Sequence, residues 1–201
     1  MRVILVAGTW GGKWCEEDSA FRRYLTEHGL ESFWFRGWSE NVDGVPNILA
    51  KGRHREWIAG GFALGYKLEA IPPHERIVIA HSHGGQPAAY CAALAGVYIH
   101  RLVTVCTPVR GDMTETWTLA HQHIGGHRHI ADTDGDPWQR AGEFLDDHLG
   151  WQRDIPGADN LPLDGIGHTG LLEDPQYFHH LVERVGDHAP TLDFLRALAL
   201  R

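Results

Sequence analysis

The sequence predicts an α/β protein, a three-layer α/β/α sandwich around a mostly parallel sheet. Short runs of consecutive apolar residues, typical of strands buried on both faces, recur along the chain. Segments with helical patterns separate these runs, and such alternation is typical of a parallel sheet with helices on both faces. The apolar fraction of 43% and the charged fraction of 22% are those of a soluble globular protein.

Each expected strand is a short apolar run, and each expected helix has an apolar face or small residues followed by a stop signal. The expected strands cover residues 3–7, 32–38, 76–80, 99–107 and 127–132. The expected helices cover residues 18–28, 55–71, 85–96, 176–186 and 190–200. Gly29 and Pro72 end the first two helices. Residues 108–127 and 137–165 have the least regular pattern, so we expect them to be mostly irregular.

Length, charge and cysteine content exclude several classes of protein. The 201 residues fit a single domain spanning 1–201 without a separate lid domain. A formal net charge of −8 excludes nucleic acid as a partner. The apolar run at 3–7 is too short for a signal peptide, and no run approaches the ~18 residues of a membrane span. The 3 cysteines lack metal-type spacing, so we expect reduced thiols, a cytoplasmic location and no integral membrane association.

A serine stands where a buried strand is expected to turn directly into a helix. The segment "IVIAHSHGG" runs from the apolar strand into small residues, with Ser82 at the junction. So tight a turn, a nucleophile elbow, leaves room only for small residues two positions before and after the serine. Ala80 and Gly84 occupy those positions. A serine that is only a helix N-cap would not require them, so we interpret Ser82 as a nucleophile.

A serine nucleophile needs a base, and the order of residues along the chain selects one of the 15 histidines. After a nucleophile elbow the acid comes next along the chain and the histidine comes last. His168 lies in "LDGIGHTGLL", where Gly165 and Gly167 allow a loop to place a side chain over the edge of the sheet. We therefore expect His168 to be the base.

The orienting acid is expected after a strand that lies between the serine and this histidine. The segment "HRHIADTDGDPWQ" offers Asp132, Asp134 and Asp136, and the first of these is expected to end the strand itself. Asp136 precedes Pro137 and Trp138, a turn followed by an apolar residue that can pack into the core. We favour Asp136 as the acid and keep Asp134 as the alternative.

Backbone N–H groups near the serine are expected to stabilise an oxyanion, each typically worth about 3–4 kcal/mol of activation barrier. The first helical N–H groups after the turn, starting with that of His83, face the place where an oxyanion forms. A second N–H is expected from "VAGTWGG", because Gly8 lets the chain turn so that Thr9 or Trp10 faces the site. The side chains of His81 and His83 point away from the serine at such a turn, so neither is expected to be the base.

Three blocks of the chain together resemble the α/β-hydrolase superfamily: "ILVAGTWGG", "IVIAHSHGGQPAAY" and "GIGHTGLL". The resemblance is closest to its minimal, lid-less bacterial lipases and esterases, and "VTVCTPVRGD" also looks like the strand after the elbow in lipases. It implies a compact α/β-hydrolase fold in which Ser82 is the nucleophile, His168 is the base, and Thr9 and His83 supply the oxyanion N–H groups. Some relatives take their acid after the fourth strand, where Asp112 lies.

The resemblance also implies an activity. It implies a serine hydrolase that cleaves carboxylic esters through an acyl-enzyme intermediate, acting on a small-molecule ester without a cofactor. A thioesterase or an amidase would use the same residues, and we keep that alternative. A non-catalytic protein that keeps the fold and binds a small molecule or a partner is a rival from another class. The complete set of serine, histidine and aspartate argues against this rival.

Two other groups of residues have competing interpretations. The histidines of "HQHIGGHRH" offer imidazole ligands, and His127 and His129 share one face of an expected strand. No metalloprotease spacing or carboxylate partner accompanies them, so we expect no functional metal. Trp10 and Trp38 are expected in loops on the elbow side, where they would form an acyl-binding wall, with core packing as the alternative.

Overall fold

In the described part of the chain, six strands form a parallel sheet at the centre of the fold, in the order β10-β8-β6-β5-β1-β2. The computed structural model describes residues 1–8, 12–36, 38, 41–42, 45–46, 54–132, 136, 151–152 and 154–182. The strands are Arg2–Val6 (β1), Glu31–Trp34 (β2), Arg76–His81 (β5), Arg101–Val105 (β6), His127–Asp132 (β8) and Asp159–Leu163 (β10). Two short antiparallel pairs join Asn41–Val42 (β3) to Val45–Pro46 (β4) and Val109–Arg110 (β7) to Trp151–Gln152 (β9).

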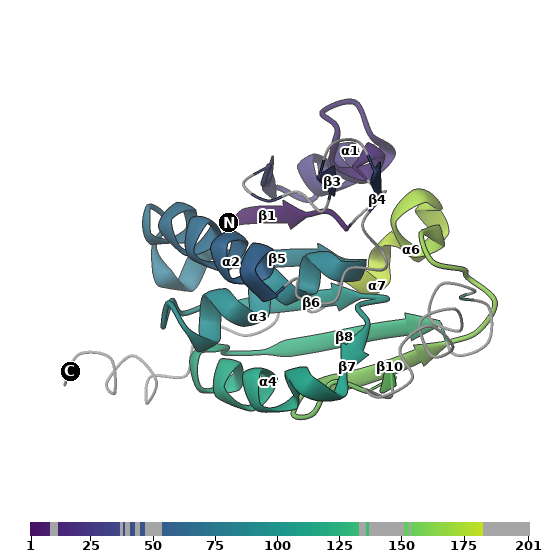
Figure 1. Cartoon of the computed structure of the whole chain (residues 1–201). Helices are drawn as coiled ribbons and strands as arrows, with labels where there is room; N and C mark the ends of the chain where they lie inside the picture. The colour runs from purple at the N-terminus through teal and green to yellow at the C-terminus, as the bar shows by residue number, and fades with distance from the viewer. Residues whose placement is uncertain are drawn as a thin grey trace.

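Helices cover both faces of this sheet, which makes the fold a three-layer α/β/α sandwich (Figure 1). The α-helices are Ala20–Glu27 (α1), His54–Glu69 (α2), Gly85–Ala93 (α3), Thr114–Ala120 (α4), Gly170–Glu173 (α6) and Phe178–Val182 (α7). The 3₁₀ helices are Lys13–Cys15 (η1), Pro73–Glu75 (η2), Ser82–Gly84 (η3), Gly111–Met113 (η4), His121–His123 (η5) and Pro175–Tyr177 (η6). Among the described residues, no helix has both the length and the apolar character needed to cross a membrane.

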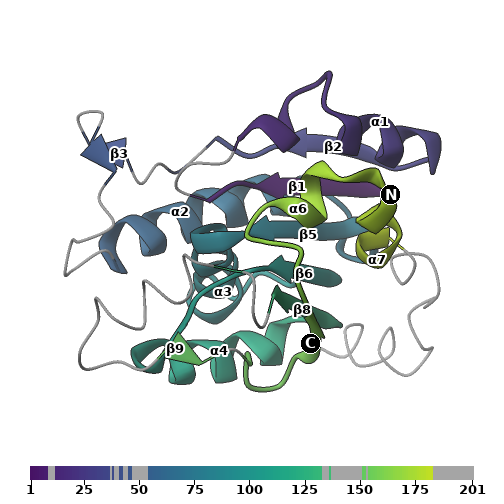
Figure 2. The ribbon, with the colours of Figure 1, turned by 90° about the vertical axis from the view of Figure 1, so that its right-hand side faces the viewer.

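The alternation of side chains along the strands divides the core into two layers. In β1, Ile4 and Val6 pack with α2, α3 and α4, whereas Val3 and Leu5 pack with α1, α6 and α7 on the other face. Figure 2 shows α2, α3 and α4 together on one side of the strands and α7 on the other. The fold class predicted from the sequence is therefore confirmed.

Glycines in α2 let this helix approach α3 closely, which explains a helix that contains several glycines. A Cβ atom at Gly61 would lie 2.8 Å from the Cβ of Tyr90 and 2.8 Å from the backbone nitrogen of Cys91. A Cβ at Gly60 would lie 2.8 Å from the Cβ of Trp38. The lower helix propensity of glycine is offset here because larger residues would push the two helices apart.

The expectation of mostly irregular structure at 108–127 and 137–165 is wrong at two places. The first segment contains α4, and the second contains β10. The sequence of β10, "DNLPL", is polar and includes Pro162, so it does not have the apolar pattern of a strand buried on both faces. Among the described strands it forms the edge of the sheet, and a proline is tolerated there because none of these strands pairs with its outer side.

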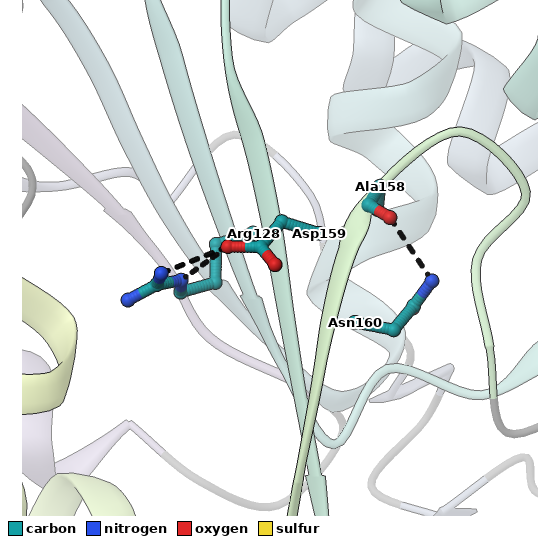
Figure 3. A network of polar contacts seen from close by, with 4 residues as sticks. All are labelled: Arg128, Ala158, Asp159 and Asn160. Carbon is teal, nitrogen blue, oxygen red and sulfur yellow. Dashed lines mark hydrogen bonds and ion pairs between the residues drawn. The ribbon is translucent and has the colours of Figure 1, made fainter.

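Polar side chains fix the position of this edge strand (Figure 3). The Nε and Nη2 groups of Arg128 on β8 donate to Oδ2 of Asp159 at 3.1 and 2.8 Å. Asn160 accepts from the backbone N–H of Ile155 at 2.9 Å and donates to the carbonyls of Ile155 and Ala158, both at 3.1 Å. The resulting register places the carboxyl end of β10 beside that of β8, where the next loop begins.

Three histidines and a threonine form a continuous row of hydrogen bonds from η5 across β8 to β6. His121 Nδ1–H donates to the carbonyl of Trp117 at 2.7 Å, so its Nε2 accepts from Nδ1–H of His127 at 2.9 Å. His127 Nε2 then accepts from the hydroxyl of Thr104 at 2.9 Å. The same oxygen accepts from Nδ1–H of His129 at 2.9 Å. When the imidazoles are neutral, the donor and the acceptor of every hydrogen bond in this row are fixed, because the Trp117 carbonyl at its end can only accept.

We expect this row of histidines to make the stability of the folded protein depend on pH. Burial lowers the pKa of His127 well below its ordinary value, and the imidazoles of His129 and His121 lower it further. As the pH falls below about 6.5, the unfolded chain takes up a proton at this residue and the folded protein does not. The free energy of unfolding therefore decreases with falling pH, by up to about 1.4 kcal/mol per pH unit for each such group.

The variant His127→Gln tests this effect, since an amide can accept and donate as the neutral imidazole does. Its free energy of unfolding should fall less steeply with acidification than that of the wild type, by about one proton in the linkage slope. Chemical denaturation of both proteins at several pH values between about 7.5 and about 5.5 measures the two slopes. Equal slopes would contradict the expectation that folded His127 stays neutral.

Candidate active site

The chain passes from β5 into α3 through a turn that contains Ser82. This residue has a φ of +53°, in the left-handed region that residues other than glycine rarely adopt. Such a conformation costs on the order of 1–3 kcal/mol and persists only where the surrounding structure fixes it. The N-cap residues of η3 and α3 are His81 and Gly84, without a side-chain cap. Ser82 therefore stands in a tight, strained strand-to-helix turn, and the N-cap interpretation of this residue is excluded.

Backbone atoms crowd this turn from the direction of β1. A Cβ atom at Gly84 would lie 2.5 Å from the carbonyl oxygen of Val6, so only glycine fits. Ala80, two residues before the serine, is completely buried at 0% exposure. A Cβ at Gly8 would lie 2.5 Å from the Cβ of Ser82. Small residues are thus needed on both sides of the serine, as the sequence predicts, and Gly8 is needed for this close approach as well.

His168 and Asp136 meet at the carboxyl edge of the sheet. His168 lies in the loop between β10 and α6, and Asp136 follows β8. His168 Nδ1 lies 2.6 Å from Asp136 Oδ2, and it must be the donor because a carboxylate only accepts. The side chain of Asp136 is 0% exposed and that of His168 is 17% exposed. Since Nδ1 holds the proton of the neutral ring, Nε2 is left as the atom that can accept one.

The loop that carries His168 is fastened to the ends of two strands. The carboxylate of Asp132, the last residue of β8, accepts from the backbone N–H of Gly165 at 3.3 Å and of Gly167 at 2.5 Å. Both glycines have positive φ, +74° and +75°, which explains why the loop contains them. His81 Nε2–H donates to the carbonyl of His168 at 2.8 Å. The loop is thus held from β8 and from β5.

Cys106 lies beside the His168–Asp136 pair, and no motif in the sequence indicated it. It follows β6 with a φ of +46° and is completely buried at 0% exposure. Burial above all, and then the charge of the nearby Asp136, raises the pKa of its thiol to about 12. The thiol is therefore protonated, and its sulfur lies within 4.8 Å of a carboxylate oxygen of Asp136.

Cys106, Asp136 and His168 also have donor atoms within 4.8 Å of one another, a spacing that a metal ion could use. A metal ion would have to displace the thiol proton, which the raised pKa opposes. It would also have to break the 2.6 Å hydrogen bond between the imidazole and the carboxylate. These three side chains therefore fit a hydrogen-bonded cluster better than a metal centre.

The side chains that flank Ser82 are engaged elsewhere, as expected from the sequence. His81 is bound to the carbonyl of His168, and the ring of His83 stacks on Trp57 with 6.0 Å between ring centroids. No hydrogen bond joins Ser82 to His168 within the described residues, and such bonds are often formed only when substrate is present. The rings of His81 and His168 lie 4.7 Å apart, so His168 is close to the turn that carries the serine.

The remaining predicted residues have different outcomes. Thr9, Trp10 and Asp134 lie outside the described residues. Trp38 is partly buried against the layer of α2 and α3, and its place in an acyl-binding wall stays a prediction. Asp112 is exposed in η4, and the structure pairs His168 with Asp136 instead.

Neither a family model nor a curated protein matches this sequence. Solved structures do match it in fold. A carboxylesterase of the thaumarchaeon Nitrososphaera gargenis is similar with a TM-score of 0.57 at 12% identity, covering 98% of this chain and 90% of that one. A methylesterase of Arabidopsis is similar with a TM-score of 0.54 at 12% identity, covering 100% of both chains.

An α/β-hydrolase enzyme from the sediment metagenome of the Mar Chica lagoon in Morocco is similar with a TM-score of 0.56 at 15% identity. The similarity covers 90% of this chain and 88% of that one. At identities this low the three similarities show a shared fold. The roles of individual residues in this chain must be argued from its own geometry.

Proposed function

We propose that this chain, which has the α/β-hydrolase fold, is a serine hydrolase that cleaves carboxylic esters. The observation that carries the proposal is the hydrogen bond between His168 and the completely buried carboxylate of Asp136. It lies at the same edge of the parallel sheet as Ser82, which directly follows β5 in a turn with positive φ. A serine on such a turn and a histidine oriented by a carboxylate are the parts that activate a hydroxyl for attack.

In the proposed reaction the Ser82 hydroxyl attacks the ester carbonyl carbon while His168 Nε2 takes its proton. Asp136 keeps the imidazole in the required tautomer and stabilises the imidazolium that forms. His168 then gives the proton to the departing alcohol, and an acyl group remains on the serine. A water molecule attacks this acyl-enzyme in the same way, which releases the acid and restores the hydroxyl.

Backbone N–H groups would stabilise the oxyanion in both halves of this reaction. We assign one to His83, the first residue after the serine, because the tight turn directs that N–H to the serine side. The other is assigned to Thr9, with Trp10 as the alternative. Trp10 and Trp38 are proposed to contact the acyl group, on the elbow side of the sheet.

Two other functions are weighed against this one. A thioesterase or an amidase would use the same serine, histidine and aspartate and would differ in the preferred leaving group. A non-catalytic binding protein with this fold would not need a histidine fixed against a buried carboxylate. The His168–Asp136 pair therefore supports an enzyme.

Ser82→Ala should remove ester hydrolysis and leave the fold intact, because an alanine fits the same turn. The loss should reach many powers of ten, since only binding and the oxyanion site would remain. Turnover of p-nitrophenyl esters of increasing acyl length, with matched thioesters and anilides, measures the loss and ranks the leaving groups. A wild-type protein without activity on any of them would favour the binding protein. A variant that keeps more than about a tenth of the activity would refute the role of Ser82.

Asp136→Asn and Asp134→Asn form a matched pair for the orienting acid. Asp136→Asn should lower turnover by about 10³–10⁴-fold, because an amide cannot hold His168 in the required tautomer. Asp134→Asn should lower it by less than about tenfold, because His168 Nδ1 already has its partner. Turnover numbers for one ester substrate provide the comparison. If the order of the two effects were reversed, the acid of the proposed mechanism would be Asp134.

A further inference from the structure

β5 ends in a histidine whose side chain is buried between two other rings. His81 is 2% exposed and directly precedes Ser82. Its ring lies 4.7 Å from that of His168 and 6.2 Å from that of Trp14, as measured between centroids. A polar ring in such a place needs a reason, since an apolar ring of similar size would fill the same space.

The one hydrogen bond of this ring within the described residues joins it to the backbone of His168. His81 Nε2 lies 2.8 Å from the carbonyl oxygen of His168. A carbonyl only accepts, so Nε2 carries the proton and Nδ1 of the neutral ring has a bare lone pair. In the described part of the chain Nδ1 is buried without a hydrogen-bond partner. The contribution of this ring, among the described residues, is therefore the donor Nε2–H, whereas its Nδ1 has no partner there.

The charge of this ring is also fixed. Burial above all, and then the adjacent imidazole of His168, lowers the pKa of His81 to about 3. His81 is therefore neutral at any pH at which His168 can act as a base. A neutral donor holds the loop without placing a second positive charge against the imidazolium that His168 becomes during the reaction.

The loop that carries His168 needs such a contact because glycines give it little stiffness. Gly165 and Gly167 both have positive φ, and Asp132 holds their N–H groups. That anchor ends one residue before His168. The contact with His81 begins at His168 itself and comes from the last residue of β5, which directly precedes Ser82, so it joins the backbone of His168 to the strand end next to the serine.

We propose that His81 is a positioning residue: its Nε2–H fixes the peptide of His168 so that the imidazole stays against Asp136 while it faces Ser82. The inference rests on the proposed function, and it assigns a role to a residue that neither attacks nor takes a proton. Without this contact, the imidazole of His168 should shift from its position relative to Ser82. A displacement of about 1 Å can cost about 10²-fold in rate.

A matched pair of variants separates the donor from the bulk of the side chain. Glutamine and methionine have similar length and shape, but only glutamine can place an N–H near the position of Nε2. His81→Met should lower kcat on a p-nitrophenyl ester by about 10²-fold with KM changed by less than about twofold. His81→Gln should recover kcat to within about tenfold of the wild type. Circular dichroism and thermal melting establish that both variants are folded.

NMR spectroscopy tests the same contact without a measurement of enzymatic activity. The proton shared by His168 Nδ1 and Asp136 should give a downfield NMR resonance in the histidine-labelled protein, assigned by its loss in Asp136→Asn. The resonance should be present in His81→Gln and be broadened or absent in His81→Met. If His81→Met does not fold, His81→Asn replaces it, because the shorter amide stays polar but cannot reach the carbonyl of His168.

The outcomes distinguish this inference from the proposed function. Equal kcat in wild type and His81→Met, or equal loss in the glutamine and methionine variants, would overturn the positioning role. An unchanged resonance in a folded His81→Met or His81→Asn would overturn it as well. Retained activity in Ser82→Ala would overturn the proposed hydrolase mechanism, whereas the NMR comparison would still decide the role of His81.

Discussion

A carboxylate that is completely buried needs hydrogen-bond donors around it, and the carboxyl edge of the sheet is arranged to supply them to Asp136. His168 donates from the loop after β10, and the buried thiol of Cys106, at the end of β6, lies within 4.8 Å of the same carboxylate. These segments can meet because β10, β8 and β6 are neighbours in the sheet. Removing the His168 donor would leave a buried charge less well stabilised, so the contact that orients the imidazole also holds the loop after β10.

The second constraint is steric and acts on the backbone beside Ser82. A Cβ atom at Gly84 or Gly8 would collide with the first strand or with the serine, and one at Gly85 would lie 2.4 Å from a side-chain atom of Thr107. These close contacts fix the backbone of the turn, and this keeps Ser82 at positive φ although it is not a glycine. A hydroxyl held in this way does not have to be ordered when substrate binds, and the same applies to an imidazole held by a buried carboxylate.

Most of the sheet could be predicted from the sequence because its strands are buried on both faces and read as apolar runs. The edge strand β10 could not, because Pro162 and polar residues suit an edge and resemble a loop. At the site, chain order and local pattern indicated Ser82, His168 and Asp136. Cys106 and the contact of His81 carried no signal, since the contact joins residues 87 positions apart and depends on how β5 and the loop after β10 meet in space.

In the mechanism proposed above, Ser82 is the residue that becomes covalently modified during ester cleavage. Reaction of the wild-type protein with a fluorophosphonate, followed by proteolysis and peptide mass spectrometry, locates the modified residue directly. We expect a single adduct on the peptide that contains Ser82, formed faster at neutral than at acidic pH because a neutral imidazole must take the hydroxyl proton. An adduct on another residue, or no adduct on a protein that hydrolyses esters, would contradict it.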